Sequence, residues 1–214
     1  MTVSRRELLA GGLFLGGAAA AMQFPFPRAL AAAAASKEPV VLSAAEWKTV
    51  EAITARLIPT DHEPGAVEAG CVNFIDKALA NEDAASARLY QAGVQSIDAV
   101  AQKRAGKFFI ELPPKEQDAV LGALEDGNAE GWPEAAPPSP LFFGQVWLHT
   151  LWGFLAEPKY GGNRDYAGWR VLGYPGGRHK LGGYTAEQMM GEAKLDALWG
   201  EKLPRSGRGT PQKG

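Results

Sequence analysis

Cysteine and histidine are scarce in this chain, and their scarcity excludes several kinds of site. The 214 residues include one cysteine, Cys71, so a disulfide within the chain, a thiolate metal cluster and the Cys-x-x-Cys-His motif for covalent haem attachment are all excluded. In an oxidising compartment a lone cysteine is either buried or bonded to another chain. Its small and apolar neighbours favour burial of Cys71, and an intersubunit disulfide stays open as the alternative.

Motifs for nucleotide, phosphate or nucleophilic chemistry are also missing, since no Gly-x-Gly-x-x-Gly follows a strand and neither a P-loop nor Gly-x-Ser-x-Gly occurs. We interpret His62 as part of a solvated turn rather than a metal ligand. His149, on an aromatic helix, is more typical of a packed, hydrogen-bonded histidine than of a haem ligand. His179 lies in a basic run, exposed or at an interface. We expect no catalytic, cofactor-binding or metal-binding residue here, although a site assembled from distant residues stays open.

The N-terminal residues have the layout of an export signal. Ser4, Arg5 and Arg6 precede leucines, which is the order of a twin-arginine signal. The apolar run that follows, residues 8–21, is shorter than the roughly 20 residues that span a bilayer as a helix. Ala29 and Ala31 form an Ala-x-Ala cleavage signature. We therefore predict that residues 1–31 are a removed twin-arginine signal and that the folded protein reaches the periplasm; a Sec signal and an ordinary N-terminal helix are the alternatives.

Without this signal the chain has about 183 residues, enough for a single domain with a real core. The 22 basic residues lose three and the 24 acidic residues lose one, which leaves a net charge of about −4. A charge so close to neutral does not favour nucleic-acid binding.

Hydrophobic spacing predicts an all-α fold. A capping box, Ser43 with Glu46, begins a helix that Pro59 ends. Further helices are expected over residues 66–80, 84–105, 113–127 and 140–156, with a loop at 126–139 and a last helix from Thr185. No stretch shows sustained strand alternation. We expect one helical domain over residues 32–203 and a disordered tail over 204–214.

Residues 157–184 form a long irregular segment that is rich in glycine, aromatic residues and arginine, with a short helix expected over 165–172. Tyrosine, tryptophan and arginine are enriched at the energetic centres of protein interfaces, so we predict a partner interface here. The alternative is that Trp169 is core and the glycines only form turns. The predicted interface residues are Tyr160, Gly161, Gly162, Asn163, Arg164, Trp169, Arg170 and Tyr174.

Two blocks of sequence resemble the gluconate 2-dehydrogenase subunit 3 family, the small (gamma) subunits of membrane-bound, flavin-dependent sugar and sugar-acid dehydrogenases. The first block is Leu57-Ile58-Pro59-Thr60-Asp61, then Pro64-Gly65-Ala66 and Val72-Asn73-Phe74-Ile75-Asp76. The second is Gly153-Phe154, Pro158, Tyr160-Gly161-Gly162-Asn163-Arg164, Gly168-Trp169 and Gly173-Tyr174-Pro175-Gly176.

This resemblance implies a membrane-associated complex. A large FAD-containing subunit of the glucose-methanol-choline type oxidises the sugar, and a c-type cytochrome subunit carries electrons onward. The small subunit contains no cofactor, binds the flavoprotein, and supports its folding and export. Competing interpretations are an independent periplasmic protein with an unrecognised metal or haem site, and a scaffold for a different partner.

Overall fold

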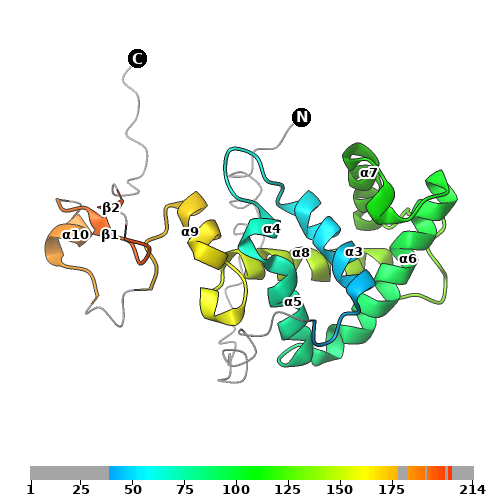
Figure 1. The fold of residues 1–214 in the computed structure, drawn as a ribbon, viewed down its shortest axis with the longest axis horizontal. Helices are drawn as coiled ribbons and strands as arrows, with labels where there is room; N and C mark the ends of the chain where they lie inside the picture. Colours follow the sequence, from blue (N-terminus) through cyan, green and yellow to red (C-terminus); the bar gives the residue numbers. More distant parts are fainter. Residues whose placement is uncertain (1–38, 178–182, 191, 201, 204–214) are drawn as a thin grey trace, which may run out of the picture.

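The computed structural model describes residues 39–177, 183–190, 192–200 and 202–203, and over these the chain is mostly helical, which confirms the all-α fold class (Figure 1). The predicted export residues Ser4, Arg5 and Arg6 lie outside the described residues. So do the predicted cleavage residues Ala29 and Ala31, and the predicted disordered tail, residues 204–214.

Longer helices form the body of the described chain, and short elements connect and extend them. The longer helices are α3 (Ala44–Leu57), α5 (Cys71–Ala80), α6 (Ala87–Ala105), α7 (Pro114–Glu125) and α8 (Ser139–Leu155). The shorter ones are α4 (Ala66–Ala69), α9 (Ala167–Leu172) and α10 (Ala186–Met190), with 3₁₀ turns η1 (Ala84–Ser86), η2 (Phe109–Glu111), η3 (Pro158–Tyr160) and η4 (Arg164–Tyr166). Two-residue strands β1 (Leu195–Asp196) and β2 (Lys202–Leu203) pair antiparallel, which the sequence did not predict.

The helix ends follow the expected local chemistry, with one correction. The backbone N–H of Ser43 donates to the Glu46 carboxylate (2.8 Å) and the N–H of Glu46 donates to the Ser43 hydroxyl (3.3 Å), so the predicted capping box is present. The prediction of one continuous helix over residues 66–80 is wrong. Gly70 has a left-handed backbone (φ 71°), which ends α4 and starts α5 in a new direction.

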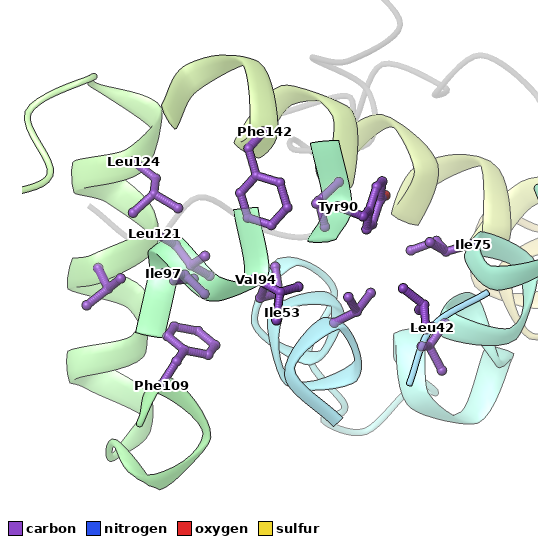
Figure 2. Packing of buried hydrophobic residues seen from close by; sticks show 14 of the residues in the cluster. Leu42, Ile53, Ile75, Tyr90, Val94, Ile97, Phe109, Leu121, Leu124 and Phe142 are labelled. Carbon is purple, nitrogen blue, oxygen red and sulfur yellow. The ribbon is translucent and has the colours of Figure 1, made fainter. Parts of the chain in front are cut away.

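The apolar helix α8 lies at the centre and packs against α3, α4, α5, α6, α7 and α9. Figure 2 shows the resulting core, to which Ile53 of α3, Ile75 of α5, Tyr90 of α6, Leu124 of α7 and Phe142 of α8 all contribute side chains. A β-carbon at Gly93 of α6 would lie 2.1 Å from the Phe142 ring, so this glycine lets the two helices approach. A helix that is apolar on most of its surface belongs at such a centre.

The chain is anchored where it leads into α3. The backbone N–H groups of Val40, Val41 and Leu42 donate to the carboxylate of Asp76 on α5, at 2.7, 2.9 and 2.8 Å. Asp76 is buried, and these bonds satisfy its charge inside the protein. Among the residues that the structure describes, no helix is long and apolar enough to cross a membrane.

Candidate functional site

Residues 157–177, which we call the capping segment, fold back over the end of α8. The last carbonyl groups of a helix have no partner within it. Here the backbone N–H of Asn163 donates to the carbonyl of Gly153 (2.7 Å), and its side-chain amide donates to that of Ala156 (2.8 Å). The indole N–H of Trp169 donates to the carbonyl of Leu155 (2.7 Å). Asn163 and Trp169 therefore cap α8.

The glycines of this segment allow backbone to pack directly on backbone. A β-carbon at Gly162 would lie 2.1 Å from the carbonyl oxygen of Gly153, and one at Gly168 would lie 1.9 Å from that of Phe154. Real β-carbons do not come so close to another atom. The N–H of Gly168 also donates to the side-chain oxygen of Asn163 (2.9 Å), which closes the turn.

Strained backbone accompanies this turn. Asn163, Asp165 and Tyr166 have left-handed φ angles of 46°, 53° and 59°. Asparagine and aspartate tolerate this conformation, but a tyrosine adopts it only when the surrounding structure holds it there, at a cost of roughly 1–3 kcal/mol. Such strain is concentrated at functional sites in proteins.

The capping segment also contacts the junction between α4 and α5. The side-chain amide of Asn73 on α5 donates to the carbonyl of Gly161 (2.6 Å). A β-carbon at Gly70 would lie 3.0 Å from a guanidinium nitrogen of Arg164 and 3.6 Å from that Gly161 oxygen. A small second core fills the space beneath; its buried residues are Ile58, Ala66, Ala69, Cys71, Phe154, Ala167 and Val171.

The eight predicted interface residues divide by exposure. Gly162, Asn163 and Trp169 are buried within this chain, so they position the segment, as the alternative interpretation of Trp169 and the glycines had it. Tyr160 and Gly161 are half-buried. The exposed members are Arg164, Arg170 and Tyr174, and these remain candidates for partner contact.

A row of aromatic rings links the capping segment to the C-terminal strands. Tyr166 lies 5.5 Å from Trp169 and 5.8 Å from Trp199 between ring centroids, and Tyr174 meets Trp169 edge-on at 5.1 Å. The backbone N–H of Leu198 donates to the carbonyl of Pro175 (2.9 Å). The residues that follow β1 are therefore attached to the capping segment.

Lys77 on α5 carries a buried charge next to this segment. The residue is 1% exposed, and its amine has no hydrogen-bond partner among the residues that the structure describes. A β-carbon at Gly161 would lie 3.0 Å from its Cδ and 3.4 Å from its Nζ, so the side chain runs along the Gly161 backbone. Burial lowers the pKa of Lys77, and the negative charge of Asp76 acts in the opposite direction.

A second polar group lies inside the core, around His149 of α8. Its Nε2 lies 2.9 Å from the carboxylate of Asp83 and its Nδ1 lies 3.0 Å from the hydroxyl of Tyr90. A carboxylate only accepts, so His149 donates from Nε2 and accepts the Tyr90 proton at Nδ1. Gln145 also donates to Asp83 (2.8 Å). Both ring nitrogens are engaged, as expected for a packed histidine rather than a haem ligand.

Burial determines how these groups ionise. It lowers the pKa of His149, which the negative charge of Asp83 partly opposes. It raises the pKa of Tyr90 well above its ordinary value, and Asp83 acts in the same direction. Tyr90 and His149 are thus held neutral, and the network functions as a structural hydrogen-bond chain.

The remaining candidates from the sequence, where the structure describes them, differ in exposure. The Cys71 side chain is fully buried, and burial raises the pKa of its thiol, so the structure favours the buried alternative over an intersubunit disulfide. His62 is largely exposed beside Asp61, in a turn. Among the described residues no group of three metal-ligating side chains is found. His179 lies outside the described residues.

The loop at residues 126–139 forms an open hollow of about 500 Å³. Trp132 lines it, and its indole N–H donates to the carbonyl of Pro137 (2.9 Å), which holds the loop closed on itself. This hollow is the second surface on which a partner segment could lie.

Sequence reasoning did not single out Lys77 or the partners of His149. A signal for Lys77 was present, because Asp76 and Lys77 are adjacent charges in an otherwise largely apolar ten-residue helix. Gln145 is four residues before His149 on α8, but Tyr90 and Asp83 are more than 50 residues away, and their meeting with His149 depends on the helix packing.

Comparison with known proteins gives one result. The family model described as Gluconate 2-dehydrogenase subunit 3 matches residues 44–176, from the first residue of α3 to the last residue but one of the capping segment. No curated protein matches the chain, and neither does any solved structure.

Proposed function

Because the chain belongs to the gluconate 2-dehydrogenase subunit 3 family, we propose that it is a non-catalytic small subunit of a periplasmic, membrane-bound gluconate or sugar dehydrogenase. In this proposal it binds the FAD-containing large subunit and supports the folding and twin-arginine export of that subunit. A c-type cytochrome subunit completes the complex, and membrane association comes through the complex.

The observation that carries this proposal is the construction of the capping segment. Its buried residues fasten it to α8 through the hydrogen bonds of Asn163 and Trp169, while Arg164, Arg170 and Tyr174 are left on the surface. A rigid segment loses little conformational freedom when a partner binds, and Tyr and Arg contribute strongly at interface centres. A fixed surface with these side chains supports a docking role.

Export is proposed from the sequence. Arg5 and Arg6 precede a weakly apolar run, as in twin-arginine signals, and that route carries folded cargo. A small subunit that binds its flavoprotein in the cytoplasm would bring a partner without a signal of its own through the same route.

The test is affinity purification of the tagged chain from periplasmic membranes. We expect a flavin-containing large chain to co-elute, together with dehydrogenase activity toward gluconate or another sugar. The Arg164→Ala and Tyr174→Ala variants should keep their helical circular dichroism and melting temperature yet release the flavoprotein.

Arg104→Ala is the matched control, because Arg104 is exposed in the last turn of α6, outside the capping segment. If Arg164→Ala, Tyr160→Ala and Tyr174→Ala all retain the partner, docking belongs elsewhere, and the 126–139 hollow is the next surface to test. A purified chain that turns over sugar without flavin would contradict the proposal itself.

A further inference from the structure

The buried amine of Lys77 lowers the stability of the isolated chain. Its amine is covered and makes no hydrogen bond within the described part of the chain, and a buried polar or charged group without a partner destabilises a fold. Its cover is thin, because the amine lies beside Gly161, which is partly exposed. A lysine whose four-carbon stem ends just beneath the surface can bring its amine out by a change of rotamer.

Arg164 places a second positive charge on the other side of Gly161, near Gly70. Its side chain is exposed and lies over Gly70, on the carbonyl side of Gly161. In the part of the chain that the structure describes, its guanidinium makes no hydrogen bond or ion pair. Lys77 and Arg164 therefore border the Gly161 peptide, and Asn73 fixes that peptide to α5.

Three acidic side chains in this part of the fold are engaged with other groups. Asp76 accepts three backbone N–H groups from residues 40–42. Glu157 pairs with Lys159, and Glu68 accepts from the Thr60 hydroxyl and the Gly65 N–H. The positive charge of Lys77 and Arg164 is thus left without a carboxylate bonded to either of them.

We propose that Lys77 and Arg164 receive an acidic segment of the large subunit, one of whose carboxylates pairs with the Lys77 amine. This proposal rests on the proposed function and names the chemistry of its docking site. Charge complementarity selects the occupant, since an ammonium and a guanidinium that border the same peptide bind carboxylates well. In the complex the Lys77 ammonium gains a carboxylate partner that it lacks in the free chain, and this pairing contributes to the free energy of binding.

The Lys77→Met variant separates this role from a structural one. Methionine keeps the length of the side chain and removes the charge, so we expect the isolated chain to melt about 2 °C or more higher. The same variant should bind the large subunit at least about thirtyfold more weakly, since truncating one member of a buried charge pair is costly. A purely structural lysine would not combine higher stability with weaker binding.

The experiment uses the full-length chain and the flavin-containing large subunit recovered from the complex. Dissociation constants are measured for the wild type, Lys77→Met and the control Lys103→Met, whose exposed side chain pairs with Glu130 at 3.0 Å. The control should bind as the wild type does. Carbodiimide coupling of the wild-type complex, followed by mass spectrometry, should join Lys77 to an aspartate or glutamate of the large subunit.

The outcomes separate this inference from the proposed function. A wild-type chain that binds no flavin-containing subunit contradicts the proposed function. A complex that forms with the same dissociation constant for Lys77→Met overturns the Lys77 site alone. A cross-link from Lys77 to a second copy of this chain, or protection of its amine by inorganic phosphate without the large subunit, also overturns it.

Discussion

At the scale of single residues, the glycines of the capping segment are explained by space rather than by flexibility alone. Gly162 and Gly168 have no room for a β-carbon, because carbonyl oxygens of α8 occupy that position. Gly144, also on α8, has nothing within 4 Å of the corresponding position. Comparing Gly162 and Gly168 with Gly144 therefore separates the effect of close packing from the loss of conformational entropy that every glycine undergoes on folding.

We expect Gly162→Ala and Gly168→Ala each to lower the free energy of unfolding by about 3 kcal/mol, because the added methyl group displaces α8 or the capping segment. The control, Gly144→Ala, should leave the free energy unchanged or raise it by about 0.5–1 kcal/mol, since alanine favours a helix. Urea unfolding followed by circular dichroism measures both. Equal stability of all three variants would contradict the tight contact.

A second residue-scale prediction concerns His149. Its folded-state pKa is lowered by burial, so the unfolded chain binds more protons once the pH falls below the ordinary value of about 6.5. Stability is therefore full above that pH and is lost as the pH falls through the folded-state pKa. In His149→Gln this part of the loss should disappear, while the exposed His62→Gln should retain it. Unfolding free energies measured between about pH 5 and 8 decide the matter; identical curves for wild type and His149→Gln would refute it.

Sequence reasoning located the capping segment but did not separate its contact residues from its buried ones. Asn163 and Trp169 belong to a mixture of glycine, aromatic and basic residues that is typical of interfaces. Their caps on the Ala156 and Leu155 carbonyls depend on how the chain turns back over α8. The left-handed backbone of Tyr166, which makes that turn, is not encoded in any local pattern of residue types.

At the scale of elements, spacing and capping chemistry predicted the main helices because these are local signals. The Ser43 box, Pro114 at the start of α7 and Gly106 after α6 all act within a few residues. Gly70 was missed as a break because a glycine within an apolar helical pattern is often tolerated. The attachment of residues 40–42 to α5 was missed as well, because it joins positions 34 to 36 residues apart.

This attachment leads to a prediction about Asp76. We expect Asp76→Asn to lower the free energy of unfolding by about 2–3 kcal/mol, because its amide nitrogen cannot accept the backbone N–H groups. Asp118→Asn is the control; Asp118 is half exposed and pairs with Arg56 at 2.7 Å, so the loss should be under about 1 kcal/mol. Hydrogen exchange should quicken at residues 40–42 in Asp76→Asn only. Unchanged exchange there would show that the carboxylate does not hold the segment.

At the scale of the whole molecule, the region that matches the family model includes the helices around α8 and nearly all of the capping segment. The helices bury a shared core around α8, and the strongest polar networks are internal and structural. Arg164, Arg170 and Tyr174 are exposed on a segment that the hydrogen bonds of Asn163 and Trp169 fix to α8.

The export proposal gives the last prediction. Replacing Arg5 and Arg6 together by lysine keeps the positive charge but removes the paired guanidinium groups that define the twin-arginine signal. The chain, and with it the flavin-containing subunit and its sugar dehydrogenase activity, should then remain in the cytoplasm, as fractionation and immunoblotting would detect. Arg28→Lys, which alters an arginine outside the pair, should leave export unchanged. Export of the double variant at the wild-type level would exclude the twin-arginine route. If the small chain alone is retained and the flavoprotein is still exported, the large subunit has its own signal. That result would contradict the proposed role in export and leave the proposed docking role unaffected.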